Sequence, residues 1–314
     1  MLNFLRWLLP TLLILASHAH AGDLAPQKIA IGDLMVRQID KGGEFLGFGF
    51  DALWVASAGR LTRVDAATTA ITDLVLEHSG GPCRNIGIGE GAVWVPDCGS
   101  GTVYKVDQAG NSMVLKIAAD MFSREGSIGV GEGAVWVVTA DAGERTLTRF
   151  DAVTGASLAE IRLPGSSSGV VVAYGSVWVT ATAKGELYRI DPATNKVRSV
   201  IKLGGNPKFL VSEQGSIWVF NEAFGTVQRV DGATGQITAT IEAGGPGTGD
   251  ISAGGGSIWV SSAGLGLGQI DPAQNRVIRA YEFERLYSKC FGMRFGAGAL
   301  WFIASRLYRV QLPS

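Results

Sequence analysis

Histidine is nearly absent from this chain. Only three occur among 314 residues, and two of them, His18 and His20, lie in the N-terminal segment, which leaves His78 alone in the remainder. One histidine cannot form a His-x-x-x-His metal pair, and the chain also lacks a Gly-x-Ser-x-Gly nucleophile elbow. The sequence therefore gives no support for a zinc hydrolase or a serine triad.

Charge of one sign and long apolar runs are lacking as well. The 27 Lys and Arg residues nearly balance the 28 Asp and Glu residues, for a formal net charge of −1. Such a balance gives no electrostatic footprint for nucleic acid or an anionic membrane. Beyond the first 21 residues no segment is long and apolar enough to cross a bilayer, and no haem-attaching Cys-x-x-Cys-His occurs.

Residues 1–21 have the form of a secretory signal. Arg6 precedes the apolar run 8–15, and an Ala-His-Ala tripeptide stands directly before Gly22. We expect cleavage at this point, a mature domain over 22–314, and a periplasmic or secreted location. A retained N-terminal anchor is the alternative.

Tryptophan recurs at an almost constant interval in the rest of the chain. The gaps are 40 to 42 residues, each tryptophan stands in a context such as VWV or IWV, and 44 glycines supply tight turns. A fixed period in this range is typical of propeller blades made of short strands. The sequence predicts an all-β fold, a seven-bladed β-propeller of four-stranded blades. The recurring residues are Trp54, Trp94, Trp136, Trp178, Trp218, Trp259 and Trp301.

Two repeated residue types invite a functional interpretation. An aspartate opens the turn between the third and fourth strands of six units, where its carboxylate can accept hydrogen bonds from the amides of its own turn. We therefore expect a turn role rather than metal binding or catalysis. Each indole is expected to fill the wedge between adjacent blades rather than to stack on a ligand. The aspartates are Asp65, Asp107, Asp151, Asp191, Asp231 and Asp271.

The seventh unit is short. Its strands are predicted at 290–295, 300–304 and 307–311, and no fourth strand follows. Residues 34–40 (LMVRQID) have the pattern of a strand that belongs to no unit of its own. Pairing this strand with the last blade would close the ring and remove two open edges. We predict three C-terminal strands and one N-terminal strand in that blade.

The repeated motif, G-x-G-[AS]-[VI]-W-V followed by [RK]-[VI]-D-x-x-T-[GN], resembles the Tyr-Val-Thr-Asn-type propeller repeats. It looks most like the exported propellers of the virginiamycin B lyase (streptogramin lyase) family, over about residues 34–312. The resemblance implies a metal-assisted eliminase with a catalytic histidine and a carboxylate near the channel. His78 ends the outer strand of the first unit, away from the predicted channel, so the implied general base is missing. No catalytic residue is therefore carried over.

At one rim of the predicted ring, the residues at equivalent positions of the repeats differ from one another. Loops that lead into the inner strands and loops that leave the second strands lie on one face, where charged and aromatic side chains gather. Such a mixture suits a polar organic ligand or a peptide loop, and a solvated surface is the alternative. The predicted ligand-binding residues are Arg84, Asn85, Asp97, Glu125, Lys208, Asn221, Asp250 and Arg294. The weak candidates for a metal are the carboxylates Asp97, Glu125 and Asp250.

Three cysteines remain to be placed. Cys83 begins the inner strand of the second unit and Cys98 follows its second strand, so both sulfurs are expected on the same face and close together. In an oxidising compartment we predict a Cys83–Cys98 disulfide. Cys290 is left over, as a free thiol, a thiol that links to a partner, or a third ligand of a soft-metal site.

The sequence favours a non-catalytic binding or scaffold protein that holds a small molecule or a partner protein on its loop face. No cofactor is predicted, and a bound divalent cation is kept as an alternative. The protein is expected to be a monomer. The alternative is a lyase-like or hydrolase-like enzyme that uses carboxylates and a divalent cation in place of histidine.

Overall fold

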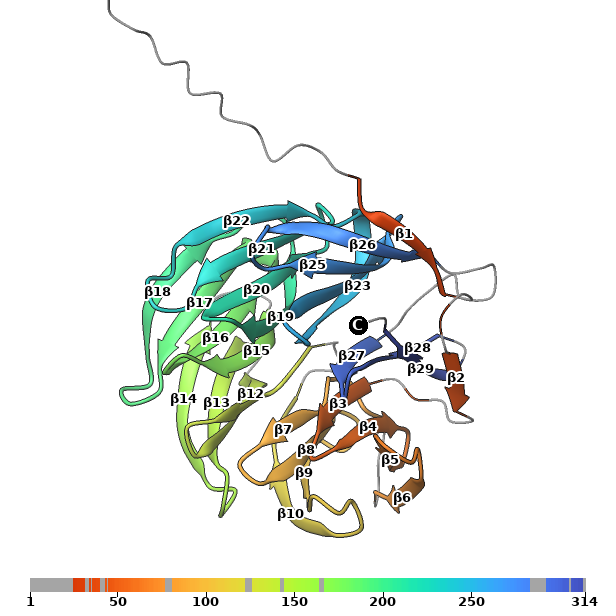
Figure 1. Ribbon diagram of the computed structural model, residues 1–314. Coiled ribbons are helices and arrows are strands. Elements are labelled where there is room, and N and C mark those ends of the chain that lie inside the picture. Colours follow the sequence, from red (N-terminus) through yellow and green to blue (C-terminus); the bar gives the residue numbers. More distant parts are fainter. Residues whose placement is uncertain are drawn as a thin grey trace, which may run out of the picture.

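The computed structural model describes residues 25–31, 34, 36–39, 43, 45–76, 81–121, 126–141, 144–163, 167–282, 292–304 and 306–312, although the side chains of 140, 141 and 144 are not described. These residues form seven β-sheets arranged in a ring (Figure 1). Each sheet is one blade, with its first strand nearest the central axis. The predicted seven-bladed propeller is confirmed.

The strands of the first four blades follow the chain without crossing. Blade 1 contains β3 (Phe45–Gly49), β4 (Ala52–Ser57), β5 (Arg60–Asp65) and β6 (Ile71–Val75). Blade 2 contains β7 (Gly87–Gly89), β8 (Ala92–Asp97), β9 (Thr102–Val106) and β10 (Met113–Ala118). Blade 3 contains β11 (Gly129–Gly131), β12 (Ala134–Asp141), β13 (Glu144–Asp151) and β14 (Ser157–Leu163). Blade 4 contains β15 (Ser167–Ala173), β16 (Ser176–Ala181), β17 (Glu186–Asp191) and β18 (Lys196–Lys202), with the short helix η2 (Thr182–Lys184) before β17.

The remaining blades complete the ring. Blade 5 contains β19 (Pro207–Glu213), β20 (Ser216–Asn221), β21 (Thr226–Asp231) and β22 (Ile237–Glu242). Blade 6 contains β23 (Gly245–Gly254), β24 (Ser257–Ala263), β25 (Gly266–Asp271) and β26 (Arg276–Glu282). Blade 7 contains β27 (Gly292–Gly296), β28 (Ala299–Ile303) and β29 (Leu307–Gln311). Among the described residues no helix is long and apolar enough to cross a membrane.

Two N-terminal strands are added to the last two blades. β2 (Val36–Ile39) pairs antiparallel with β29, so blade 7 has three C-terminal strands and one N-terminal strand. β1 (Gln27–Ala30) pairs parallel with β26 and gives blade 6 a fifth strand, at the outer edge (Figure 1). Blade 6 thus has the four expected strands, and β1 adds one more at its outer edge. The segment before β2 reaches the neighbouring blade because Ile29 and Ile31 pack against the core around Trp259.

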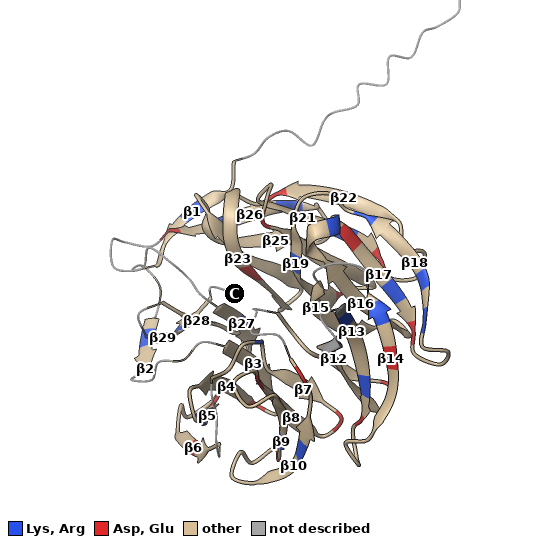
Figure 2. Cartoon of the chain, turned by 180° about the vertical axis from the view of Figure 1, so that it is seen from behind, with Lys and Arg blue, Asp and Glu red and all other residues tan. Residues whose placement is uncertain are grey.

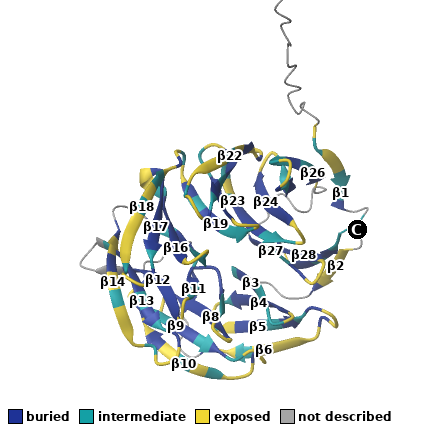
Figure 3. Cartoon of the chain, turned by 60° about the vertical axis from the view of Figure 1, so that its left-hand side comes forward, coloured by how far each residue is buried: buried dark blue, intermediate teal, exposed yellow. Residues whose placement is uncertain are grey.

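The core lies between the blades rather than inside any one of them. Every repeat tryptophan is 0–2% exposed, and the indole Nε1 donates a hydrogen bond to the carbonyl five residues earlier at 3.0–3.2 Å. Trp94 of blade 2, for example, packs with Val135 and Val137 of blade 3. The second strands are therefore buried along most of their length, whereas the outer strands β10, β14 and β18 are largely exposed (Figure 3). The predicted packing role of the tryptophans is confirmed.

A cation on the third strand joins most of these tryptophans to the next blade. The guanidinium of Arg149 lies 5.0 Å from the centre of the Trp136 ring, and its Nη1 donates to the carbonyl of Pro192 in blade 4 at 2.6 Å. Arg229 makes the equivalent contacts with Trp218 and with Pro272 of blade 6. The cation is part of the repeated motif, but its role as a latch between blades could not be inferred from one unit, because its acceptor belongs to the next.

The six repeated aspartates perform the turn role predicted for them. Oδ1 of each accepts at least one backbone N–H from the turn that it opens. For Asp65, Asp151 and Asp231, the amide of the threonine three residues later, followed by its hydroxyl, holds the pKa of the carboxyl below its ordinary value of 3.8. Folding therefore favours the ionised form of these aspartates.

Acid is expected to destabilise the protein through these turns. A pKa lowered by folding stabilises the fold above the ordinary value of 3.8, and the contribution is lost as the pH falls through the folded value. Thermal melting between about pH 5 and pH 2 should therefore show a falling midpoint. Asp231→Asn keeps an acceptor oxygen but cannot titrate, so its midpoint should fall less steeply. Equal slopes for the variant and the parent protein would contradict this explanation.

Candidate functional site

The candidate site is the loop face, which we define by two groups of segments at one end of the ring. Segments leading into the inner strands are 82–86, 126–128, 167–169, 206–209, 244–250 and 292–294. Segments leaving the second strands are 57–60, 97–101, 181–186, 221–226 and 262–266. The turns that begin with the repeated aspartates lie at the opposite end of the ring, together with the cations that stack on the tryptophans. Every predicted ligand-binding residue except Glu125, which is outside the described residues, belongs to the loop face.

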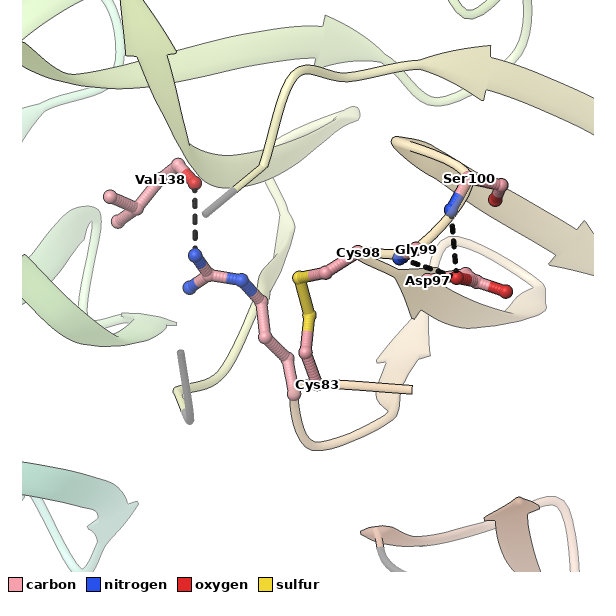
Figure 4. Close-up of a disulfide and its surroundings, with 7 residues drawn as sticks. Cys83, Asp97, Cys98, Gly99, Ser100 and Val138 are labelled. Atoms are coloured by element: carbon pink, nitrogen blue, oxygen red, sulfur yellow. Dashed lines mark hydrogen bonds between the residues drawn. A yellow bond between two sulfur atoms is a disulfide. The ribbon is translucent and has the colours of Figure 1, made fainter. Parts of the chain in front are cut away.

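Arg84 extends from blade 2 to blade 3 and is buried. It is 1% exposed, and its Nη2 donates to the carbonyl of Val138 on β12 at 3.2 Å (Figure 4). Within the described part of the chain its Nε and Nη1 have no acceptor. Burial, followed by the nearby positive charge of Arg145, lowers the pKa of Arg84 to about 10. The guanidinium remains charged at neutral pH in a place where a charge is costly.

Asn85 joins the segments of blades 2, 3 and 4 near the axis. Its backbone N–H donates to the carbonyl of Gly126 at 2.9 Å and pairs the chain in parallel with Ser127. Ser127 in turn donates its N–H to the carbonyl of Ser168 at 3.1 Å. The three segments are thereby held side by side, which fixes the backbone next to Arg84.

The predicted disulfide between Cys83 and Cys98 is present. The Cα atoms are 5.7 Å apart, and the adjacent Pro82 and Asp97 form an isolated bridge. Asp97 Oδ1 accepts the amides of Gly99 and Ser100 at 2.9 and 3.1 Å, while the buried Oδ2 has no hydrogen-bond partner among the described residues. Figure 4 places Asp97 and Val138 on opposite sides of the disulfide. The charged groups of Arg84 and Asp97 thus have different hydrogen-bond partners.

Replacing Cys98 with Ser should lower stability under oxidising conditions. The bridge closes a loop with a sequence separation of 15, for which the chain-entropy model gives about 3 kcal/mol. Chemical denaturation of Cys98→Ser and of Cys290→Ser, the latter outside the described residues, supplies a matched pair. We expect the first to resemble the reduced parent protein and the second to resemble the oxidised one. Equal stability of both variants would show that the bridge contributes nothing.

Asp250 and Arg294 form a clamp between blades 6 and 7. Oδ2 of Asp250 accepts Nη1 of Arg294 at 2.8 Å and the backbone N–H of Met293 at 3.0 Å, and Oδ1 accepts the amide of Ile251 at 2.9 Å. Asp250 is 3% exposed and is the acidic residue of β23, which Figure 2 shows as the red segment of that strand. Both carboxylate oxygens are committed to donors of the protein itself, which does not suit a metal ligand.

Lys208 and Asn221 lie together on blade 5. Lys208 Nζ is 3.1 Å from a carboxylate oxygen of Glu222 and 5.1 Å from the centre of the Phe209 ring. Asn221 is 1% exposed, and its Nδ2 donates to Gln228 at 3.0 Å, while its buried Oδ1 has no hydrogen-bond partner in the part of the chain that the structure describes. This group is polar and largely enclosed.

The structure thus divides the predicted residues among three places, namely blades 2 and 3, blade 5, and the junction of blades 6 and 7. Across the described residues no three side chains of His, Cys, Asp or Glu gather as a metal site requires, and no histidine is present to act as a general base. Arg145 was missed. The interval from Trp136 to its stacked Arg149 is longer than the corresponding interval in blade 2, and this length, which carries Arg145 towards the rim, was the available signal.

A family model describes part of the chain. Residues 99–240 match a repeat of unknown function (DUF6923). The comparison with curated proteins gave no match. These results agree with a repeat architecture and assign no activity.

Solved structures of propellers superpose on most of the chain. A streptogramin B lyase structure has a TM-score of 0.73 at 17% identity, covering 88% of this chain and 97% of that one. A catalytically inactive virginiamycin B lyase from Staphylococcus aureus, with quinupristin, has a TM-score of 0.70 at 16% identity, covering 89% and 100%. BamB from Moraxella catarrhalis has a TM-score of 0.61 at 17% identity, covering 86% and 85%. At these identities the likeness establishes the propeller fold that this chain shares with the lyases and with BamB.

Proposed function

We propose that this protein is exported by means of residues 1–21 and acts in the periplasm or outside the cell as a non-catalytic binding or scaffold module. Its loop face holds a small molecule or a partner protein. The scaffold is rigid because each blade is buried against the next, so the loop segments are held in fixed positions.

The proposal rests on the location of buried polar atoms that have no hydrogen-bond partner among the described residues. Buried side-chain atoms without a partner, counted over the described residues, fall into two groups. At the opposite end they are the Nε atoms of Arg63, Arg149 and Arg309, each of which lies over a tryptophan ring. On the loop face they belong to Arg84, Asp97, Ser167 and Asn221. Buried polar groups normally find partners, so an excess at one face is typical of a surface completed by a ligand.

The second candidate is a metal-assisted lyase or hydrolase, which the likeness to streptogramin B lyase favours. Against it stands the use of the candidate carboxylates. Asp97 Oδ1 is engaged in its own turn and Asp250 in the clamp with Arg294, and Glu125 is outside the described residues. The general base that such a mechanism needs has no candidate histidine on the described loop face.

Two measurements test the proposal. Native mass spectrometry of the exported protein, purified without chelator, should give a chain that begins at Gly22 and carries an organic ligand, a partner protein or nothing, but no metal. Incubation with quinupristin and Mg²⁺ should leave the depsipeptide intact. Metal-dependent cleavage of quinupristin, or a bound metal required for turnover, would replace the binding module with the enzyme.

A further inference from the structure

We propose that Arg84 anchors a carboxylate group of the bound ligand, enclosed between blades 2 and 3 at the loop face. This inference rests on the proposed binding function and specifies the chemistry of one contact. The ligand is either a small organic acid or a peptide with an accessible carboxylate.

The first observation is that the Arg84 guanidinium has fewer hydrogen-bond acceptors than donors within the described residues. One backbone carbonyl, that of Val138, is the single acceptor that the described residues offer to Arg84, and both Nε and Nη1 are left without one. An arginine that is 1% exposed gets little help from water. A buried charge without a counter-charge costs several kcal/mol, so native proteins rarely retain one unless something pairs with it.

The second step is the sign of the surroundings. The charged neighbour that acts on Arg84 is Arg145, whose Nη1 donates to the carbonyl of Ser167 at 3.1 Å. Asp97, the described carboxylate nearest in sequence, is turned into its own loop through Gly99 and Ser100. Among the described side chains, two positive charges therefore lie at this junction between blades, an arrangement that favours an anion over a cation.

The third step is the close approach of Arg84 to residue 126. A Cβ atom on Gly126 would lie 2.8 Å from Nη1 of Arg84 and 2.5 Å from the carbonyl oxygen of Ser168. A side chain at this position would displace the guanidinium or the backbone of blade 4. Glycine thus leaves space for the guanidinium at this junction. A second N–H of Nη2, together with Nε or Nη1, could donate two parallel hydrogen bonds to a planar carboxylate.

The experiment compares the thermal melting of four proteins in succinate and in chloride at equal ionic strength and neutral pH. They are the parent protein, Arg84→Met, Arg84→Lys, and Arg162→Met, which removes an exposed arginine of blade 3 as a charge control. The parent and Arg162→Met should gain about 2–4 °C in a saturable manner with succinate. Arg84→Lys should respond weakly, because an ammonium cannot bind a carboxylate in the same bidentate way, and Arg84→Met should not respond.

The melting temperature without succinate separates this proposal from an internal pair. If Arg84 has no partner in the chain, Arg84→Met should melt at the parent's temperature or above it, because an uncompensated buried charge is removed. If Arg84→Met and Glu125→Gln both lower the midpoint and their effects are not additive, a carboxylate of the chain itself pairs with Arg84 and the proposal is overturned.

Two further outcomes would also overturn it. Equal responses of the parent and Arg84→Met to succinate would show that the anion binds elsewhere, and a response to inorganic phosphate but not to succinate would replace the carboxylate with a different anion. A ligand mass that persists in Arg84→Met would defeat this inference while leaving the binding function in place. Cleavage of quinupristin would defeat the binding function by itself.

Discussion

Removal of residues 22–40 is expected to leave a chain that aggregates instead of folding. The deletion takes away β2, which supplies the fourth strand of blade 7 and pairs with β29 from Val36↔Val310 to Ile39↔Leu307. Ile39 is 5% exposed and belongs to the core that joins blade 7 to blade 1. Without β2 the edge of β29 is open to another chain, and the ring is no longer closed through its own N-terminus. Size-exclusion chromatography and circular dichroism of the exported variant measure the result.

A shorter deletion provides the matched control. Removing residues 22–30 takes away β1 but keeps β2, so the ring stays closed while blade 6 loses its fifth strand. This variant should fold as a monomer with a lower melting temperature, because the edge of β26 is uncovered. If the longer deletion melts like the intact protein, closure by β2 does not stabilise the fold.

Replacing Asp250 with Asn should destabilise the protein by about 2–4 kcal/mol, because it leaves the largely enclosed guanidinium of Arg294 without its counter-charge. The pair spans two blades, and the side chains of Arg294 and Asp250 are 16% and 4% exposed. Urea denaturation of Asp250→Asn, Arg294→Met and the double variant measures the coupling. The double variant should lose clearly less than the sum of the single losses.

The same variant separates a clamp from a metal ligand. For a clamp, the loss of stability is equal with and without added divalent cation. For a metal ligand, the parent protein gains stability with the cation and Asp250→Asn does not. A cation effect that disappears in Asp250→Asn and in Glu125→Gln would place a metal at these carboxylates and contradict the clamp.

The features that could be predicted from the sequence are those that repeat. The tryptophan period gave the number of blades, and the Asp turns required only residues within three or four positions of one another. The bridge between Cys83 and Cys98 was also accessible, because antiparallel neighbours in one blade place the two residues on one face. Each of these inferences uses contacts within one unit. For the tryptophans and the Asp turns, the same pattern recurs in other units and supports the inference.

The contacts that the sequence did not predict join different units. Arg84 meets Val138, Asp250 meets Arg294, and β1 meets β26, and the described residues of the other blades do not repeat any of these pairs. Arg84, Asn85 and Asp97 all lie at blades 2 and 3, but the sequence did not predict that Asn85 pairs its backbone with Ser127 or that Asp97 caps its own turn. A residue that departs from the repeat is visible in the sequence, but its partner is not.

The sequence by itself therefore determined the class of fold, the seven blades and the turn and packing roles of the repeated residues, since local periodicity and burial of large side chains specify them. Only the tertiary structure decided which charges on the loop face are neutralised and which are not. That difference arises because the partner of a charge in a ring depends on the angle between neighbouring blades and on loop lengths. A few ångströms there decide whether Asp250 finds a guanidinium and whether Nη1 of Arg84 finds no acceptor among the described residues.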